Sequence, residues 1–192
     1  MEGIRSFIAI EVPQPLLARM GEVQRELRRM EAGVNWVRPE GIHLTLKFLG
    51  SISAEELEKI ARAIAPVVAA WNPFELSIHG LGCFPSSRNP RVIWVGIDRG
   101  GGEASSLQKV IEDKAAEVGF PPEGRPFKPH LTLGRVRAPI GRSAFIQVME
   151  KHKDVEIGSF QAREVYLFKS ELKPSGAVYT KLQTFPMEKN QI

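Results

Sequence analysis

The chain has 192 residues, 43% of them hydrophobic and 25% charged, which is the ordinary balance of a soluble globular protein. No apolar run approaches the roughly 20 residues that a membrane helix requires, and the N-terminus lacks a long apolar signal segment, so we expect a cytoplasmic protein without a membrane partner. The net charge of +4 permits an acidic ligand without requiring one.

The first segments alternate between strand and helix character. Residues 4–12 are rich in β-branched and aromatic types and predict a strand that ends before Pro13. Apolar residues then recur at helical spacing over 15–31, which predicts an amphipathic helix. The segment 42–49, IHLTLKFL, returns to strand character, and Gly50 is expected to end it.

A second helix and two strands are expected next. Ser53 and Glu56 have the spacing of a capping box, which predicts a helix to about residue 70, kinked or shortened by Pro66. Alternating residues over 74–84 and a nearly continuous apolar run over 91–97 predict two strands joined by a turn.

The rest of the chain repeats this order. Glycines at 100–102 predict a flexible turn before a helix over about 104–118, and the proline-rich segment 121–129 predicts a loop. A strand over 130–136 and a helix near 141–152 follow. Three strands complete the chain, over 155–160, 162–172 and 177–185.

The repeated order indicates an internal duplication. The tetrapeptide HLTL occurs at 43–46 and at 130–133, and it follows Arg5 by 38 residues in the first copy and Arg91 by 39 in the second. We therefore predict an α+β fold with pseudo-twofold symmetry. Two interleaved lobes within a single domain over residues 1–192 would each have a small, mainly antiparallel sheet, helices on its outer face, and a shared central cleft.

The two HLTL strands are the predicted catalytic elements. Alternate side chains of a strand point to opposite faces, so His43 and Thr45 share one face while the leucines share the other. The same holds for His130 and Thr132. If a twofold axis relates the lobes, both polar faces line the cleft.

Opposed histidines suit the cleavage of a phosphodiester. A neutral imidazole takes a proton from water, and an imidazolium gives one to the leaving oxygen. The hydroxyls of Thr45 and Thr132 are able to donate hydrogen bonds to the phosphate, and Arg135 adds a fixed, bidentate positive charge.

Other residues are assigned no role in the chemistry. His79 and His152 are interpreted as non-catalytic, and Cys83, the single cysteine, is not expected to be a nucleophile or to form an internal disulfide. A metal held by the two histidines and two threonines is the alternative for the paired motifs, but no acidic residue or cysteine stands at matching ligand spacing. We predict no metal and no cofactor.

These motifs resemble a known family. HLTLKFLG and KPHLTLGR are similar to the paired HxTx motifs of the two-histidine phosphoesterase superfamily, and RSFIAIEVP, GLGCFP and RVIWVGI extend the similarity to its RNA 2′,3′-cyclic phosphodiesterase (2′-5′ RNA ligase-like) branch. The resemblance implies a bilobal fold and metal-independent hydrolysis that leaves a 2′-phosphomonoester. It implies that His43 is the proton donor and His130 the proton acceptor, with Thr45, Thr132 and Arg135 as phosphate ligands.

Substrate recognition is less defined by the sequence. RNA ends or nucleotide 2′,3′-cyclic phosphates are the expected partners of a monomeric enzyme. Phe84 is the favoured residue for stacking on a base among four aromatic candidates, the others being Phe7, Phe48 and Trp94. The alternatives are reversible 2′-5′ ligation, a small cyclic nucleotide or ADP-ribose derivative as substrate, and an RNA- or nucleotide-binding module without catalysis.

Overall fold

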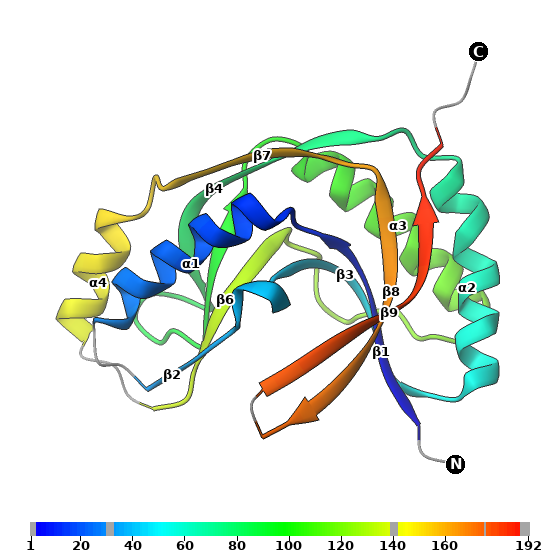
Figure 1. Cartoon of the computed structure of the whole chain (residues 1–192), viewed down its shortest axis with the longest axis horizontal. Coiled ribbons are helices and arrows are strands. Elements are labelled where there is room, and N and C mark those ends of the chain that lie inside the picture. The colour runs from blue at the N-terminus through cyan, green and yellow to red at the C-terminus, as the bar shows by residue number, and fades with distance from the viewer. Residues whose placement is uncertain (1–2, 30–32, 139–141, 175, 189–192) are drawn as a thin grey trace.

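Two antiparallel sheets form the centre of the molecule (Figure 1). The computed structural model describes residues 3–29, 33–138, 142–174 and 176–188. The strands are β1 (Ile4–Glu11), β2 (Val34–Trp36), β3 (His43–Ile52), β4 (Phe74–Phe84), β5 (Val92–Ile97), β6 (His130–Val136), β7 (Glu156–Ala162), β8 (Glu164–Lys173) and β9 (Gly176–Pro186). Sheet A has the order β3-β1-β8-β9, and sheet B has the order β2-β6-β5-β4-β7.

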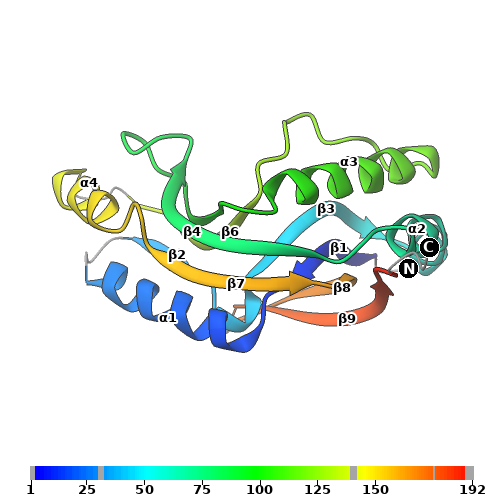
Figure 2. The same cartoon turned by 90° about the horizontal axis from the view of Figure 1, so that it is seen from above.

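Helices cover both sheets. They are α1 (Gln14–Arg28), α2 (Ala54–Ala69), α3 (Gly101–Glu117), α4 (Arg142–Lys151) and the short 3₁₀ helix η1 (Pro39–Gly41). Helices α2 and α3 contact each other and the strands of sheet A, whereas α1 contacts β7 of sheet B. Figures 1 and 2 place α4 beyond α1, at the opposite end of the molecule from α2.

The predicted α+β architecture and internal duplication are confirmed, and the two copies exchange strands. The order β3-β1-β8 in sheet A has its counterpart in β6-β5-β4 of sheet B. Strand β4 belongs to the first copy but lies in sheet B, and β8 belongs to the second copy but lies in sheet A. Each sheet is therefore built from both copies.

The structure differs from the predicted elements in three details. Gly50, which has a φ of 76°, does not end its strand, because it pairs with Ser6 after a bulge at Leu49 and pairing continues to Ile52. Helix α3 begins at Gly101, so only Gly100 forms the predicted turn, with a left-handed φ of 79°. Pro66 does not shorten α2, which continues to Ala69. The predicted capping box of Ser53 and Glu56, by contrast, is confirmed.

Some predicted ends lie outside the described residues, namely 30–31 of the first helix and 141 of the last one. The short edge strand β2 was not predicted from the sequence. Only three residues form it, and their pairing with β6 is a long-range contact that leaves no local pattern.

One hydrophobic cluster connects both sheets to the helices. It includes Ile8 and Ile10 of β1, which are 0% and 1% exposed, together with Leu131 of β6. The opposite face of β1 presents Phe7 and Ala9, which form a second, smaller cluster with Phe168. This second face of sheet A is the one that carries the motif histidine.

Candidate active site

The alternation predicted for the two HLTL motifs is confirmed. Their leucines are buried, with no more than 2% of their surface exposed, whereas His43, Thr45, His130 and Thr132 remain partly exposed. Strands β3 and β6 belong to different sheets and contact each other directly. Each sheet therefore contributes one imidazole and one hydroxyl to the region where the two sheets meet.

His43 lies in an aromatic pocket. Its ring stacks on Phe7, with 4.5 Å between centroids and 21° between planes, and meets the ring of Tyr179 edge-on at 5.2 Å. Burial among these rings lowers the pKa of His43 to about 4, although a hydrogen bond to the backbone of Gly41 opposes the shift. The imidazole is accordingly neutral in the unliganded protein near pH 7.

A hydrogen bond from Nδ1 to the backbone orients the ring of His130. Its Nδ1 lies 2.6 Å from the carbonyl oxygen of Lys128, and because a carbonyl only accepts, Nδ1 carries the proton in the neutral ring. That assignment leaves Nε2 with the free lone pair. Burial lowers the pKa of His130, the positive charge of Arg135 lowers it further, and the Lys128 hydrogen bond opposes both effects.

The backbone two residues earlier acts on both histidines. The Lys128 carbonyl accepts from Nδ1 of His130, and a backbone hydrogen bond to Gly41 raises the pKa of His43. A ring whose Nδ1–H is bonded in this way has its Nε2 free to exchange a proton with a bound ligand.

The charges of three arginines act on Tyr179 of β9. Burial raises the pKa of the Tyr179 phenol, while the charges of Arg135, Arg5 and Arg38 lower it, so all three guanidinium groups act on this side chain. Arg38 also donates from Nη2 to the carbonyl of Ala177 at 2.9 Å. The charge of Arg135 thus acts on His130 in sheet B and on Tyr179 in sheet A.

Sequence reasoning missed Tyr179, Arg5 and Arg38 as neighbours of the site. Tyr179 lies 136 residues beyond His43 in the chain, and only the pairing of β8 with β1 brings its hairpin to the first motif. No local spacing signals such a contact.

Phe84 lies beside the second motif. Its ring meets that of His130 edge-on at 5.0 Å and lies 5.0 Å from that of Trp94, and the Nζ of Lys128 lies 5.8 Å from its centroid. The indole Nε1 of Trp94 is buried and has no hydrogen-bond partner among the described residues. Of the other two aromatic candidates, Phe7 is buried and Phe48 is 55% exposed.

The remaining histidines and the cysteine are outside the paired motifs. His152 contacts Glu26 at 3.1 Å. His79 stands two strands from His130 in sheet B, with Gly96 paired between them. Burial raises the pKa of the Cys83 thiol, which disfavours the nucleophilic thiolate. Within the described ranges, no three histidines, cysteines or acidic residues cluster as metal ligands, and no helix is long and apolar enough to span a membrane.

Comparison with known proteins gives consistent matches over most of the chain. The family model for LigT-like phosphoesterases matches twice in tandem, at residues 10–94 and 95–179, with one HLTL motif in each match. The chain is 36% identical over 182 residues to the RNA 2′,3′-cyclic phosphodiesterase of Methanothermobacter thermautotrophicus, covering 95% of this chain and 98% of that relative.

Two solved structures also match nearly the full length of the chain. TT0787 of Thermus thermophilus has a TM-score of 0.82 and 30% identity, covering 97% of this chain and 100% of that one. Escherichia coli LigT in its apo form has a TM-score of 0.77 and 25% identity, covering 98% and 100%.

Proposed function

Since the chain belongs to the LigT-like phosphoesterase family, we propose that it hydrolyses the 2′,3′-cyclic phosphate ends of RNA to 2′-phosphomonoesters. The observation that carries the proposal is the pair of equivalent imidazoles. Each lobe presents one partly exposed histidine of an HLTL strand where the two sheets meet. Binding alone requires no such pair of proton-transferring groups.

His130 acts as the general base. Its Nδ1–H is engaged by the Lys128 carbonyl, so Nε2 accepts a proton from water as the water oxygen attacks phosphorus. The P–O3′ bond breaks, and His43 donates a proton to O3′. The products are a 3′-hydroxyl and a 2′-phosphate, and each proton transfer contributes roughly 10²- to 10⁴-fold in rate.

Thr45, Thr132 and Arg135 stabilise the phosphate. The two hydroxyls donate to the non-bridging oxygens, where negative charge increases in the transition state. Arg135 is exposed on β6 and presents a guanidinium group that suits bidentate contact with phosphate. Its charge also keeps His130 in the neutral form that a base requires.

The negative charge of the substrate favours the protonated form of His43 that an acid requires. His43, with a pKa of about 4 in the unliganded protein, becomes an effective acid when the anionic phosphate binds beside it, because a nearby negative charge favours the imidazolium. The two histidines thus reach opposite protonation states only in the complex.

The remaining parts of the proposal concern the context of the reaction. The imidazoles, hydroxyls and guanidinium supply acid, base and charge stabilisation, so the reaction is proposed to need no metal and no cofactor. Phe84 is proposed to contact the terminal base, supported by its position against His130. We propose a monomeric, cytoplasmic enzyme in which residues 1–192 act as one bilobal unit, as the exchange of β4 and β8 supports.

The test is hydrolysis of an oligoribonucleotide that ends in a 2′,3′-cyclic phosphate, in EDTA, with the product phosphate mapped to O2′ or O3′. A 2′-phosphate from the wild type, and loss of at least about 10²-fold in rate with either His43→Ala or His130→Ala, is the expected result. Full activity in both variants contradicts the mechanism. Adding excess 5′-hydroxyl RNA distinguishes hydrolysis from 2′-5′ ligation, and binding without turnover in the wild type indicates a non-catalytic module.

A further inference from the structure

A buried lysine follows the first motif. Lys47 lies two residues after Thr45 on β3, yet its side chain is only 1% exposed. A bulge at Leu46 shifts the pairing so that Lys47 stands opposite Ile8, whose side chain belongs to the core. Lys47 therefore points away from the histidines and toward helix α3.

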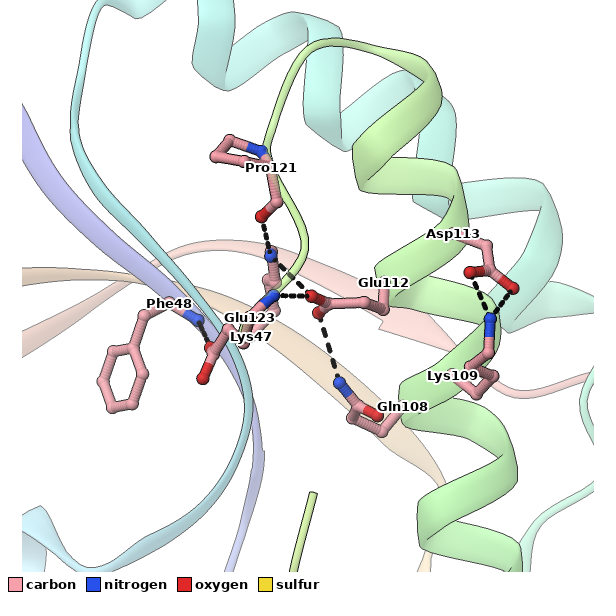
Figure 3. Close-up of polar contacts among 8 residues, drawn as sticks. All are labelled: Lys47, Phe48, Gln108, Lys109, Glu112, Asp113, Pro121 and Glu123. Carbon is pink, nitrogen blue, oxygen red and sulfur yellow. Dashed lines mark hydrogen bonds and ion pairs between the residues drawn. The ribbon is translucent and has the colours of Figure 1, made fainter. Parts of the chain in front are cut away.

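The lysine ammonium binds two groups outside its own strand. Its Nζ lies 2.9 Å from Oε1 of Glu112 on α3 and 2.7 Å from the carbonyl oxygen of Pro121, as Figure 3 shows. The second carboxylate oxygen of Glu112 accepts a hydrogen bond from Nε2 of Gln108 at 3.2 Å. Both charges of the pair are thus partnered in the protein interior.

The same hydrogen bonds fix the start of the proline-rich loop, residues 121–123. The backbone N–H of Glu123 donates to Oε1 of Glu112 at 2.5 Å, and the carboxylate of Glu123 accepts the backbone N–H of Phe48 at 3.2 Å. Residues 121–123 are therefore bonded both to β3 and to α3 (Figure 3).

This loop leads directly to the second motif. Residues 121–129 contain four prolines, which fix φ and limit the freedom of the segment. Phe127 packs against the core, and the Lys128 carbonyl then accepts the Nδ1–H of His130. Anchoring the beginning of this stiff segment restricts where the carbonyl of Lys128 lies.

Stability alone does not account for a buried lysine here. Removing two charges from water is costly, and replacing a buried ion pair by apolar side chains of similar size is often neutral or stabilising. We propose that Lys47 and Glu112 form a positioning pair, which holds the 121–129 loop against β3 so that the Lys128 carbonyl orients His130 toward the first motif. The kinetic part of this inference rests on the proposed function, whereas the orientation of the ring does not.

The test compares two double variants of the full chain. In Lys47→Met/Glu112→Met the buried pair is replaced by apolar side chains. The matched control is Lys109→Ala/Asp113→Ala, which removes an exposed ion pair from the same helix (Figure 3). The primary readout is the ¹⁵N chemical shifts of the imidazole nitrogens in long-range ¹H–¹⁵N spectra, which report the tautomer of each histidine without any turnover.

We expect the buried-pair variant to remain folded, with a Tm within about 5 °C of the wild type. His130 should change from the Nδ1–H tautomer to a mixture while the shifts of His43 stay unchanged. The kcat for cyclic phosphate hydrolysis should fall about 10- to 100-fold, because small misplacement of a reacting group is costly. The control variant should match the wild type in all three measurements.

Two results overturn the inference. One is a folded buried-pair variant that keeps the wild-type His130 tautomer. The other is a variant with a strongly lowered Tm and equal disturbance of His43 and His130, which assigns the pair to general stability. A change of the His130 tautomer in a protein whose wild type hydrolyses no cyclic phosphate supports the positioning role and rejects the proposed function separately.

Discussion

The imidazole of His43 stacks on the ring of Phe7, with 4.5 Å between centroids and 21° between planes. His130 has a different neighbour, because Phe84 meets its ring edge-on at 5.0 Å and 88°. Two histidines in equivalent places of a duplicated motif thus have different surroundings: His43 among three aromatic rings of sheet A, and His130 near the charge of Arg135. Different surroundings allow the two groups to carry out opposite proton transfers.

The first prediction concerns the pH dependence of turnover. The kcat/KM profile reports pKa values of the free enzyme, and kcat reports those of the complex. Because the pKa of His43 is about 4 in the free protein, kcat/KM should rise as pH falls from 8 to 5. Bound phosphate favours the imidazolium, so the basic limb of kcat should lie at higher pH than that of kcat/KM. Coincident basic limbs near pH 6.5 would contradict this coupling.

The second prediction concerns stability against pH. Between pH 6.5 and about 4 the unfolded chain binds a proton at His43 that the folded protein does not, so the free energy of unfolding decreases as pH falls through this window. The depressed pKa corresponds to about 3 kcal/mol at most. His43→Phe keeps an aromatic ring beside Phe7 and Tyr179 but cannot titrate. Urea unfolding should show that the free energy of unfolding decreases less between pH 7 and pH 4.5 in the variant than in the wild type. Equal decreases in both proteins would refute a lowered pKa of His43.

The third prediction concerns Gly82, which pairs with Trp94 across β4 and β5. A Cβ at Gly82 would lie 2.1 Å from the indole of Trp94, whose ring is 6.4 Å from that of His130. Gly82→Ala should therefore displace the indole, change the tryptophan fluorescence and lower kcat about 10-fold or more. Gly102→Ala is the matched control, since nothing lies within 4 Å of its Cβ position in the first turn of α3. Unchanged fluorescence and activity in Gly82→Ala would show that the indole does not shape the site.

The fourth prediction concerns Arg135. Its positive charge lowers the pKa of His130, so Arg135→Gln should raise that pKa in an NMR titration. Arg135→Lys keeps the charge but loses the planar fork, so the His130 pKa should stay near that of the wild type while hydrolysis slows. We expect roughly 10-fold slower turnover for Lys and about 100-fold for Gln. A His130 pKa that does not respond to Arg135→Gln would argue against the electrostatic contact.

The sequence predicted which faces of the motif strands are buried better than it predicted the assembly around them. The period of two in each HLTL motif is a local property, and it correctly separated His43 and His130 from the buried leucines. The aromatic pocket of His43 depends on Tyr179, whose hairpin reaches β1 only through long-range pairing. Lys47 is a similar case, because a bulge reversed the face that the motif spacing assigns to it.

The exchange of strands has a consequence for the assembly of this fold. In a single copy that ended after β4, this strand would have no second sheet to join, and sheet A would lack β8, which the other copy supplies. A half-length chain would therefore form both sheets only as a dimer in which each chain adds one strand to the sheet of the other. Because both copies belong to one chain here, this exchange of strands is intramolecular, and the assembly of the two sheets does not depend on protein concentration.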